Sequence, residues 1–272
     1  MPEPEIIDIR RLASLLDDPD EGVAISAMAE LLNRESELGE IPAELQESSS
    51  PLMRRRIHQL QSALTMIQRR RYLNHLLEAE NINFLDGLLQ IHLQWFDRDS
   101  EVTLQRRLKG FRSELQRHSS GDLREIGNAF AVCGVTAAPL TTLKVEQYCL
   151  GTMLDDKCGA APLWCGMICH MYRDKKLQTV RYQGRFAVIS DSEILIPENN
   201  WQTSPLPPAE ELESWPLKNL LHLTAVTLFS AAVNSDSFRY ILTISQALTG
   251  SSSGEALSLL PYPYNPELSP EG

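Results

Sequence analysis

The chain has 272 residues, of which 43% are hydrophobic and 22% charged, and its formal net charge is −11. This composition excludes disordered, fibrous and collagen-like proteins, and it suffices for one large hydrophobic core or two modest ones. The first residues lack the basic and apolar regions of a secretory signal. The most apolar run, residues 220–233, is too short for a bilayer core of ~30 Å. We therefore expect a cytoplasmic protein with no membrane partner.

Charge is unevenly distributed along the chain. Residues 1–50 carry 3 basic and 13 acidic side chains, whereas residues 51–118 carry 12 basic and 7 acidic ones. An acidic chain with one basic segment favours internal charge pairing, because the rest of the molecule repels a polyanion. Nucleic-acid binding is the less favoured alternative for two arginine triplets, Arg54–Arg56 and Arg69–Arg71, which share the solvent face of one predicted helix.

Leucine spacing near the N-terminus predicts a helical hairpin. Leu12 and Leu16 share a helical face, Asp17–Asp20 interrupts it, and Ala27 and Leu31 resume the same period. This pattern is similar to one HEAT-type repeat. No second copy follows at that period, and a solenoid needs about three. We therefore expect a HEAT-like hairpin that caps a helical domain.

Three longer amphipathic helices are predicted next. Apolar residues at three- and four-residue spacing indicate helices over residues 52–80, 82–96 and 101–115, the last of them capped by Ser100. The first half of the chain is thus predicted to be mostly α-helical.

In the second half of the chain, the hydrophobic pattern changes from helical to strand periodicity. Residues 163–172 are apolar on nearly every face, and Pro162 suits a first helical position, so a buried central helix is expected. Three short antiparallel strands then follow at Leu177–Tyr182, Arg185–Ser190 and Glu193–Ile196. Residues 204–208 form a stiff proline-rich connection, and helices lead from Pro216 to about residue 248.

Four segments around the central helix match a known order of elements. They are residues 146–149 (Glu-Gln-Tyr-Cys), 159–162 (Gly-Ala-Ala-Pro), 184–188 (Gly-Arg-Phe-Ala-Val) and 193–197 (Glu-Ile-Leu-Ile-Pro). This order resembles the transglutaminase-like core of the bacterial SirB-type family. In that family a Gly-x-Pro-Ile helix start is followed by Pro-Gly-His-Phe-Leu and then by Ile-Asp-Pro-Phe.

The resemblance implies a scaffold whose catalytic residues have been replaced. The cysteine position of the wider superfamily falls near Ala161, the histidine position at Arg185 and the aspartate position at Ile196. A guanidinium stays protonated at any relevant pH, so Arg185 offers no general base.

These patterns together predict a predominantly helical α+β protein. We expect an N-terminal helical domain (residues 1–118) with the HEAT-like hairpin, packed on a transglutaminase- or cysteine-protease-like core (119–204) with a small antiparallel sheet. C-terminal helices (205–250) pack on that core. The tail (251–272), rich in serine, proline and glycine, is expected to lie over the surface or to be disordered.

Three functional hypotheses follow. The leading one is a catalytically inactive protein that binds an unidentified protein, peptide or small ligand. The second is a divergent thiol hydrolase or acyltransferase that uses Cys158, which lies just before the central helix and can feel its dipole. The third is an anion or peptide-terminus binder at Arg185, with Tyr182, Asn199, Asn200 and Trp201 nearby.

The five cysteines predict neither disulfides nor a metal centre. An odd number of cysteines without an export signal favours free thiols. Cys165 and Cys169 lie on an apolar helix with no matching pair elsewhere, which does not fit structural zinc ligation. Burial as small hydrophobic side chains is the expected state, and no metal or cofactor is expected.

Overall fold

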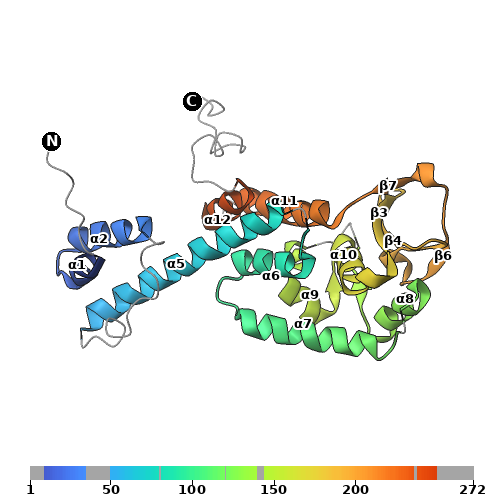
Figure 1. Cartoon of the computed structure of the whole chain (residues 1–272), viewed down its shortest axis with the longest axis horizontal. Coiled ribbons are helices and arrows are strands. Elements are labelled where there is room, and N and C mark those ends of the chain that lie inside the picture. The colour runs from blue at the N-terminus through green and yellow to red at the C-terminus, as the bar shows by residue number, and fades with distance from the viewer. Residues whose placement is uncertain are drawn as a thin grey trace, which may run out of the picture. The chain divides into compact units, whose positions relative to one another are not determined.

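The computed structural model describes residues 9–34, 50–79, 81–119, 121–139, 144–235 and 238–249 (Figure 1). The chain divides into two compact units, Met1–Arg69 and Arg70–Gly272, and helix α5 (Pro51–Glu78) runs through the boundary. This division differs from the predicted domain boundary at residue 118, which stays a prediction. Residues 70–118 belong to the larger unit because their apolar side chains join the same hydrophobic cluster as the central helix. The predicted tail from residue 251 lies outside the described residues.

The smaller unit contains the predicted helical hairpin. Helix α1 (Ile9–Ser14) continues into a 3-10 turn, η1 (Leu15–Asp17), and α2 (Glu21–Asn33) begins after Asp20, whose side chain accepts a hydrogen bond from Gly22 N. A small cluster joins the hairpin to α5 through buried Leu12, Leu16, Ala27, Leu31, Met53, Ile57, Leu60 and Leu64. The likeness of this hairpin to a HEAT repeat stays a prediction.

Arg56 corrects the prediction that the first arginine triplet faces solvent. Its side chain is buried, and its Nη1 donates to the carbonyl oxygens of Leu16, at 2.8 Å, and Asp18, at 2.6 Å. These carbonyls lie at the break between α1 and α2, where the helical hydrogen-bond ladder stops and acceptors need external donors. Arg56 therefore ties α5 to the hairpin through backbone oxygens rather than through carboxylates.

The larger unit is mostly helical. Its helices are α6 (Phe84–Trp95), α7 (Glu101–Gln116), α8 (Leu123–Val132), α9 (Leu150–Asp156), α10 (Ala161–Met171), α11 (Leu217–Asn234) and α12 (Phe238–Thr249). The predicted cap is confirmed, since Ser100 Oγ accepts from Thr103 N at the start of α7. Within the described ranges, no helix is long and apolar enough to cross a membrane.

A five-stranded antiparallel sheet, in the order β6-β5-β4-β3-β7, covers one side of this unit. The three predicted strands are present as β3 (Gln178–Tyr182), β4 (Arg185–Ile189) and β5 (Glu193–Leu195). Two further strands, β6 (Thr203–Pro205) and β7 (Leu212–Ser214), were not predicted, because they fall in or after the proline-rich connection. Both are edge strands, where proline costs no hydrogen bond to a further strand.

The two faces of the sheet pack differently. Val188 and Leu195 belong to the main hydrophobic cluster, which contains the buried side chains of α10. Val180, Ala187 and Ile194 belong to a separate small cluster on the other face. The alternation of side chains along the strands produces this division. Helix α10 is buried along its whole length except at His170, as its apolar sequence predicts.

Candidate functional site

The start of α10 carries no nucleophile. Its N-cap is Ala160, which provides no side-chain hydrogen bond, and Ala161 and Pro162 follow as buried residues of the first turn. Ala160 N donates to the carbonyl oxygen of Gln147, at 3.0 Å, which anchors the helix start to the 3-10 turn η2 (Val145–Tyr148). The backbone is thus well ordered where a thiolate would gain from the helix dipole, but the side chains there are apolar.

Arg185 is exposed at the beginning of β4. It pairs across the sheet with Tyr182, which packs on the small cluster, so strand alternation puts Arg185 on that face and not on the α10 face. Arg185 Nη1 donates to Asn199 Oδ1 at 3.1 Å. The side chain is therefore held by a neutral partner on the turn that follows β5.

Ile196 is a core residue of the small cluster, 7% exposed and packed with Val180, Ala187 and Ile194. Between α10 and the sheet, β4 and β5 instead contribute apolar side chains, Val188 and Leu195. A polar residue at position 196 would lose solvation without facing α10.

Glu198 is an acidic side chain close to α10. It lies in η4 (Pro197–Asn199), a turn that packs against α10, and its Oε2 atom is buried without a hydrogen-bond partner among the described residues. Burial raises the pKa of Glu198, which the nearby Arg185 partly opposes. The Glu198 charge also helps to raise the pKa of Cys165 in α10, although burial of that thiol contributes most.

Cys158 is the half-buried cysteine of the chain. It lies in β2 (Cys158–Gly159), which pairs in parallel with β1 (Thr136–Ala137), and its Sγ accepts a hydrogen bond from Gln147 Nε2 at 3.3 Å. Within the part of the chain that the structure describes, no histidine or carboxylate is hydrogen-bonded to this sulfur. Cys158 thus has a donor that can stabilise negative charge and lacks a proton acceptor in hydrogen-bond reach.

The other four cysteines are buried free thiols, as predicted. Burial raises the pKa of Cys133 and Cys149, and it raises that of Cys169 to about 12. A thiol in this state is a poor nucleophile at neutral pH. The described residues contain no group of three or more histidine, cysteine, aspartate or glutamate side chains that could hold a metal ion.

The residues proposed around Arg185 separate into two kinds. Asn199 and Asn200 are exposed, and Asn200 adopts a left-handed backbone conformation with φ 54°. Tyr182 accepts a hydrogen bond from Gln183 Nε2 at 2.9 Å. Trp201, in contrast, is 2% exposed, and its Nε1 donates to Val135 O at 2.7 Å. Trp201 is therefore part of the core and is not available to a surface ligand.

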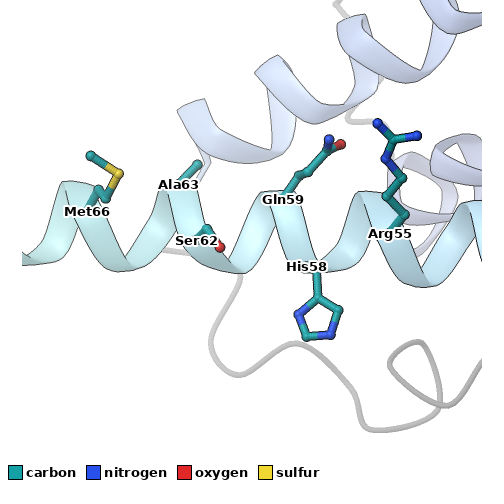
Figure 2. Close-up of a pocket in the computed structure, with 6 residues that line it drawn as sticks. All are labelled: Arg55, His58, Gln59, Ser62, Ala63 and Met66. Carbon is teal, nitrogen blue, oxygen red and sulfur yellow. The ribbon is translucent and has the colours of Figure 1, made fainter. Parts of the chain in front are cut away.

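A shallow depression of about 550 Å³ lies along α5 in the smaller unit. Figure 2 shows its described lining, Arg55, His58, Gln59, Ser62, Ala63 and Met66. These side chains all come from one helix, so within the described residues the depression has a single wall. It supplies no converging set of chemical groups.

Two residues of the site region were not given a role from sequence. Gln147 stands in the motif at residues 146–149, but its amide meets Cys158 because η2 packs against β2, where Ala160 N donates to Gln147 O. Glu198 follows Ile196 and Pro197, and its burial depends on the packing of η4 against α10. A single sequence contains no pattern that indicates which carboxylate will be buried.

No protein-family model matches the chain, and no curated protein or solved structure is significantly similar to it.

Proposed function

We propose that this chain is a transglutaminase-like protein of the SirB type that has no catalytic machinery and acts by binding a protein, a peptide or a small ligand. The observation that carries the proposal is that the three positions of the motif hold no nucleophile, no base and no carboxylate. Ala161 opens α10, Ile196 is a core residue, and Arg185 offers no base.

The sheet geometry supports the part of this proposal that concerns the missing catalytic machinery, independently of residue type. Val188 and Leu195 are the β4 and β5 side chains in the main cluster with α10. Positions 185 and 196 lie on the other face, so a single substitution at either of them would not direct a base toward the start of the helix. Cysteine-based acyl transfer requires a nucleophile, a base and an orienting group in mutual reach.

The test is a turnover assay of the full chain with activated ester, amide and peptide substrates. We expect hydrolysis and acyl transfer at the background rate, and the same rate from Cys158→Ser. The variant Cys169→Ser is a control for the removal of a buried thiol. Robust turnover that disappears only in Cys158→Ser would overturn the proposal and identify the nucleophile.

A second candidate, a divergent thiol enzyme, is favoured by one observation: Cys158 is half-buried and accepts a hydrogen bond from Gln147. Its test is the alkylation rate of each cysteine against pH, mapped by mass spectrometry on the native chain. A rate at Cys158 that stays high well below the ordinary thiol pKa of ~8.5 supports this candidate. A rate that falls in parallel with that of free cysteine removes it.

A third candidate is recognition of an anion or a peptide carboxylate by Arg185. The hydrogen bond to Asn199 Oδ1 orients the guanidinium and leaves further donors for a ligand. Titration with acetate, phosphate and a short peptide, followed by NMR, tests it. Shifts that are lost in Arg185→Ala and kept in Arg181→Ala, another exposed arginine of the same sheet, support it. Equal shifts in both variants remove it.

A further inference from the structure

The two edges of helix α7 differ in how their charges are satisfied. The edge toward α9 is neutralised by two ion pairs. Arg107 Nη1 lies 2.7 Å from Asp155 Oδ2, and Lys157 Nζ lies 3.0 Å from Glu114 Oε1. Each cation on this edge therefore has an anionic partner from the neighbouring element.

The outer face and the opposite edge of α7 carry cations without such partners. Arg106, Lys109, Arg112 and Arg117 are exposed, and no ion pair joins any of them to another described residue. The first three follow each other at three-residue spacing, so their side chains form one ridge along the helix.

A second basic segment, with exposed Arg173 and Lys175, follows the end of α10. Arg112 and Arg173 both help to lower the pKa of His170, after burial of the imidazole as the largest cause, whereas Asp86 raises it. Arg173 belongs to the turn η3 (Arg173–Lys175), so the two arginines bring like charge to one place from different parts of the chain.

Lys175 lies beside Gly121, a few residues after the end of α7. A Cβ atom at Gly121 would lie 2.7 Å from Lys175 Cε, so the lysine stem passes close to this glycine. Lys175 Nζ forms a long ion pair with the neighbouring Asp174, at 3.8 Å from Oδ2, and both side chains are exposed. The six cations Arg106, Lys109, Arg112, Arg117, Arg173 and Lys175 form what we call the basic edge.

We propose that the basic edge binds an acidic segment of another polypeptide. Guanidinium groups bind carboxylates with two parallel hydrogen bonds, and four of the six cations are arginines. Six exposed cations around one exposed carboxylate, Asp174, leave a local excess of positive charge, which steers a partner of the opposite sign toward this surface. The proposal is independent of whether the core has catalytic activity, because none of the six residues belongs to the region around α10's N-terminus.

An acidic peptide fits the surface better than a nucleic acid does. The nearby rings of Phe111 and Tyr172 are buried, so neither is available for stacking on the bases of a single strand. A long polyanion also experiences the whole molecule, whose net charge is −11, whereas a short peptide experiences mainly the local field.

The experiment measures fluorescence anisotropy of a labelled peptide of about ten residues in which glutamate alternates with glycine, at low salt and at about 0.15 M salt. We expect the full chain to bind this peptide and not its glutamine counterpart. The double substitution Arg112→Gln/Arg173→Gln is expected to weaken binding by about tenfold or more, and Arg112→Lys by less than about threefold.

The matched control is Arg107→Gln, on the same helix, which removes a cation that Asp155 already neutralises. It should change the affinity by less than about twofold. Circular dichroism confirms that each variant is folded.

Three outcomes would overturn the proposal: equal binding of the glutamate and glutamine peptides, equal losses in the double and the control variant, or no binding at low salt. Tighter binding of a single-stranded oligonucleotide or of phosphatidylserine vesicles would also overturn it, and would assign the basic edge to that anion instead.

Discussion

Helix α6 buries polar side chains on two sides, and the two sides differ in whether these side chains have hydrogen-bond partners. On the side toward α9, His92 has a hydrogen bond at each ring nitrogen. Gly151 N donates to Nδ1 at 3.3 Å, and Nε2 lies 2.9 Å from Asp99 Oδ2. The other side is the one where Gly87 lies against Leu221 of α11. There Gln90 and Gln94 are buried like His92, but Gln90 Oε1 and Gln94 Nε2 have no hydrogen-bond partner among the described residues.

The bonds of His92 define its protonation state and its role. Because Nδ1 accepts from a backbone N–H, the neutral ring carries its proton on Nε2 and donates it to Asp99. Gly151 lies in the first turn of α9, whose N-cap residue Cys149 provides no side-chain cap. His92 therefore caps α9 from another helix and satisfies one of its free N–H groups. A buried polar group stabilises the fold when it is paired and costs free energy when it is not.

The largest effect is expected from His92→Leu. This change removes both hydrogen bonds and leaves Gly151 N–H buried without an acceptor, so the free energy of unfolding should fall by about 2–3 kcal/mol. Urea denaturation measures it. His118→Leu, at an exposed histidine, is the control and should change stability by less than about 0.5 kcal/mol. Similar values for the two variants would show that the cap contributes nothing.

Gly151→Ala should have the next largest effect. The added Cβ would lie 2.6 Å from His92 Cε1 and 2.9 Å from Nε2, so the ring must move and its hydrogen bonds must distort. We expect a loss of about 1–3 kcal/mol in thermal or urea unfolding. Gly110→Ala in α7 is the matched control, since nothing lies within 4 Å of its Cβ position. There alanine should stabilise the helix by about 0.5–1 kcal/mol. Stabilisation by both changes would contradict the close packing of Gly151 on His92.

Substitutions of Gln90 and Gln94, on the other side of α6, should increase the free energy of unfolding instead of lowering it. Gln90→Met and Gln94→Met keep the side-chain length and remove Gln90 Oε1 and Gln94 Nε2, which have no partner among the described residues, so each should stabilise the chain by about 1–2 kcal/mol. Gln116→Met, on the exposed end of α7, is the control for the change in side-chain type. Destabilisation at positions 90 and 94 would indicate that ordered water satisfies these amides, which a high-resolution crystal structure would then show.

The smallest effect is the pH dependence. Burial lowers the pKa of His92 most, Arg107 adds to this shift, and Asp99 and Asp155 oppose it. The unfolded chain, with an ordinary histidine pKa of ~6.5, therefore takes up the proton first as the pH falls. Stability should decrease below pH ~6.5 until the folded imidazole is protonated too.

The measurement compares wild type with His92→Leu in urea between about pH 5 and pH 7.5. The difference in unfolding free energy should shrink toward acid by less than about 1.4 kcal/mol per pH unit, the limit for one proton. The pKa of His170 is lowered as well, but that residue is present in both proteins and cancels. Parallel profiles would show that His92 does not titrate in this range.

Much of the fold follows from local patterns. The sequence predicted the 28-residue helix α5, the Ser100 cap of α7, the buried helix α10 and three strands of the five-stranded sheet. Helical and strand periodicity are properties of a short window. The strands β6 and β7 were not predicted, because their residues are rich in proline and acidic side chains and acquire strand conformation only by pairing with β5 and β3.

The candidate site also depends on strand pairing, which local patterns do not reveal. The apolar composition of residues 163–172 predicts that Cys165 and Cys169 are buried, and both are. The motif spacing pointed to positions 161, 185 and 196, but no spacing along the chain could show that 185 and 196 lie on the sheet face away from α10. That depends on the strand register.

By itself, the sequence determined where the main helices and central strands form, that α10 is buried, and that Ala161, Arg185 and Ile196 lack the chemistry of a thiol enzyme. Only the tertiary structure decided that Arg56 and His92 are buried and paired, and that Gln90 Oε1 and Gln94 Nε2 are buried without a partner among the described residues. It also decided that Arg112 and Arg173, from different parts of the chain, both act on the pKa of His170. The reason is physical: secondary structure responds to neighbours within a few residues, whereas the state of a polar side chain depends on partners that packing brings from distant parts of the chain.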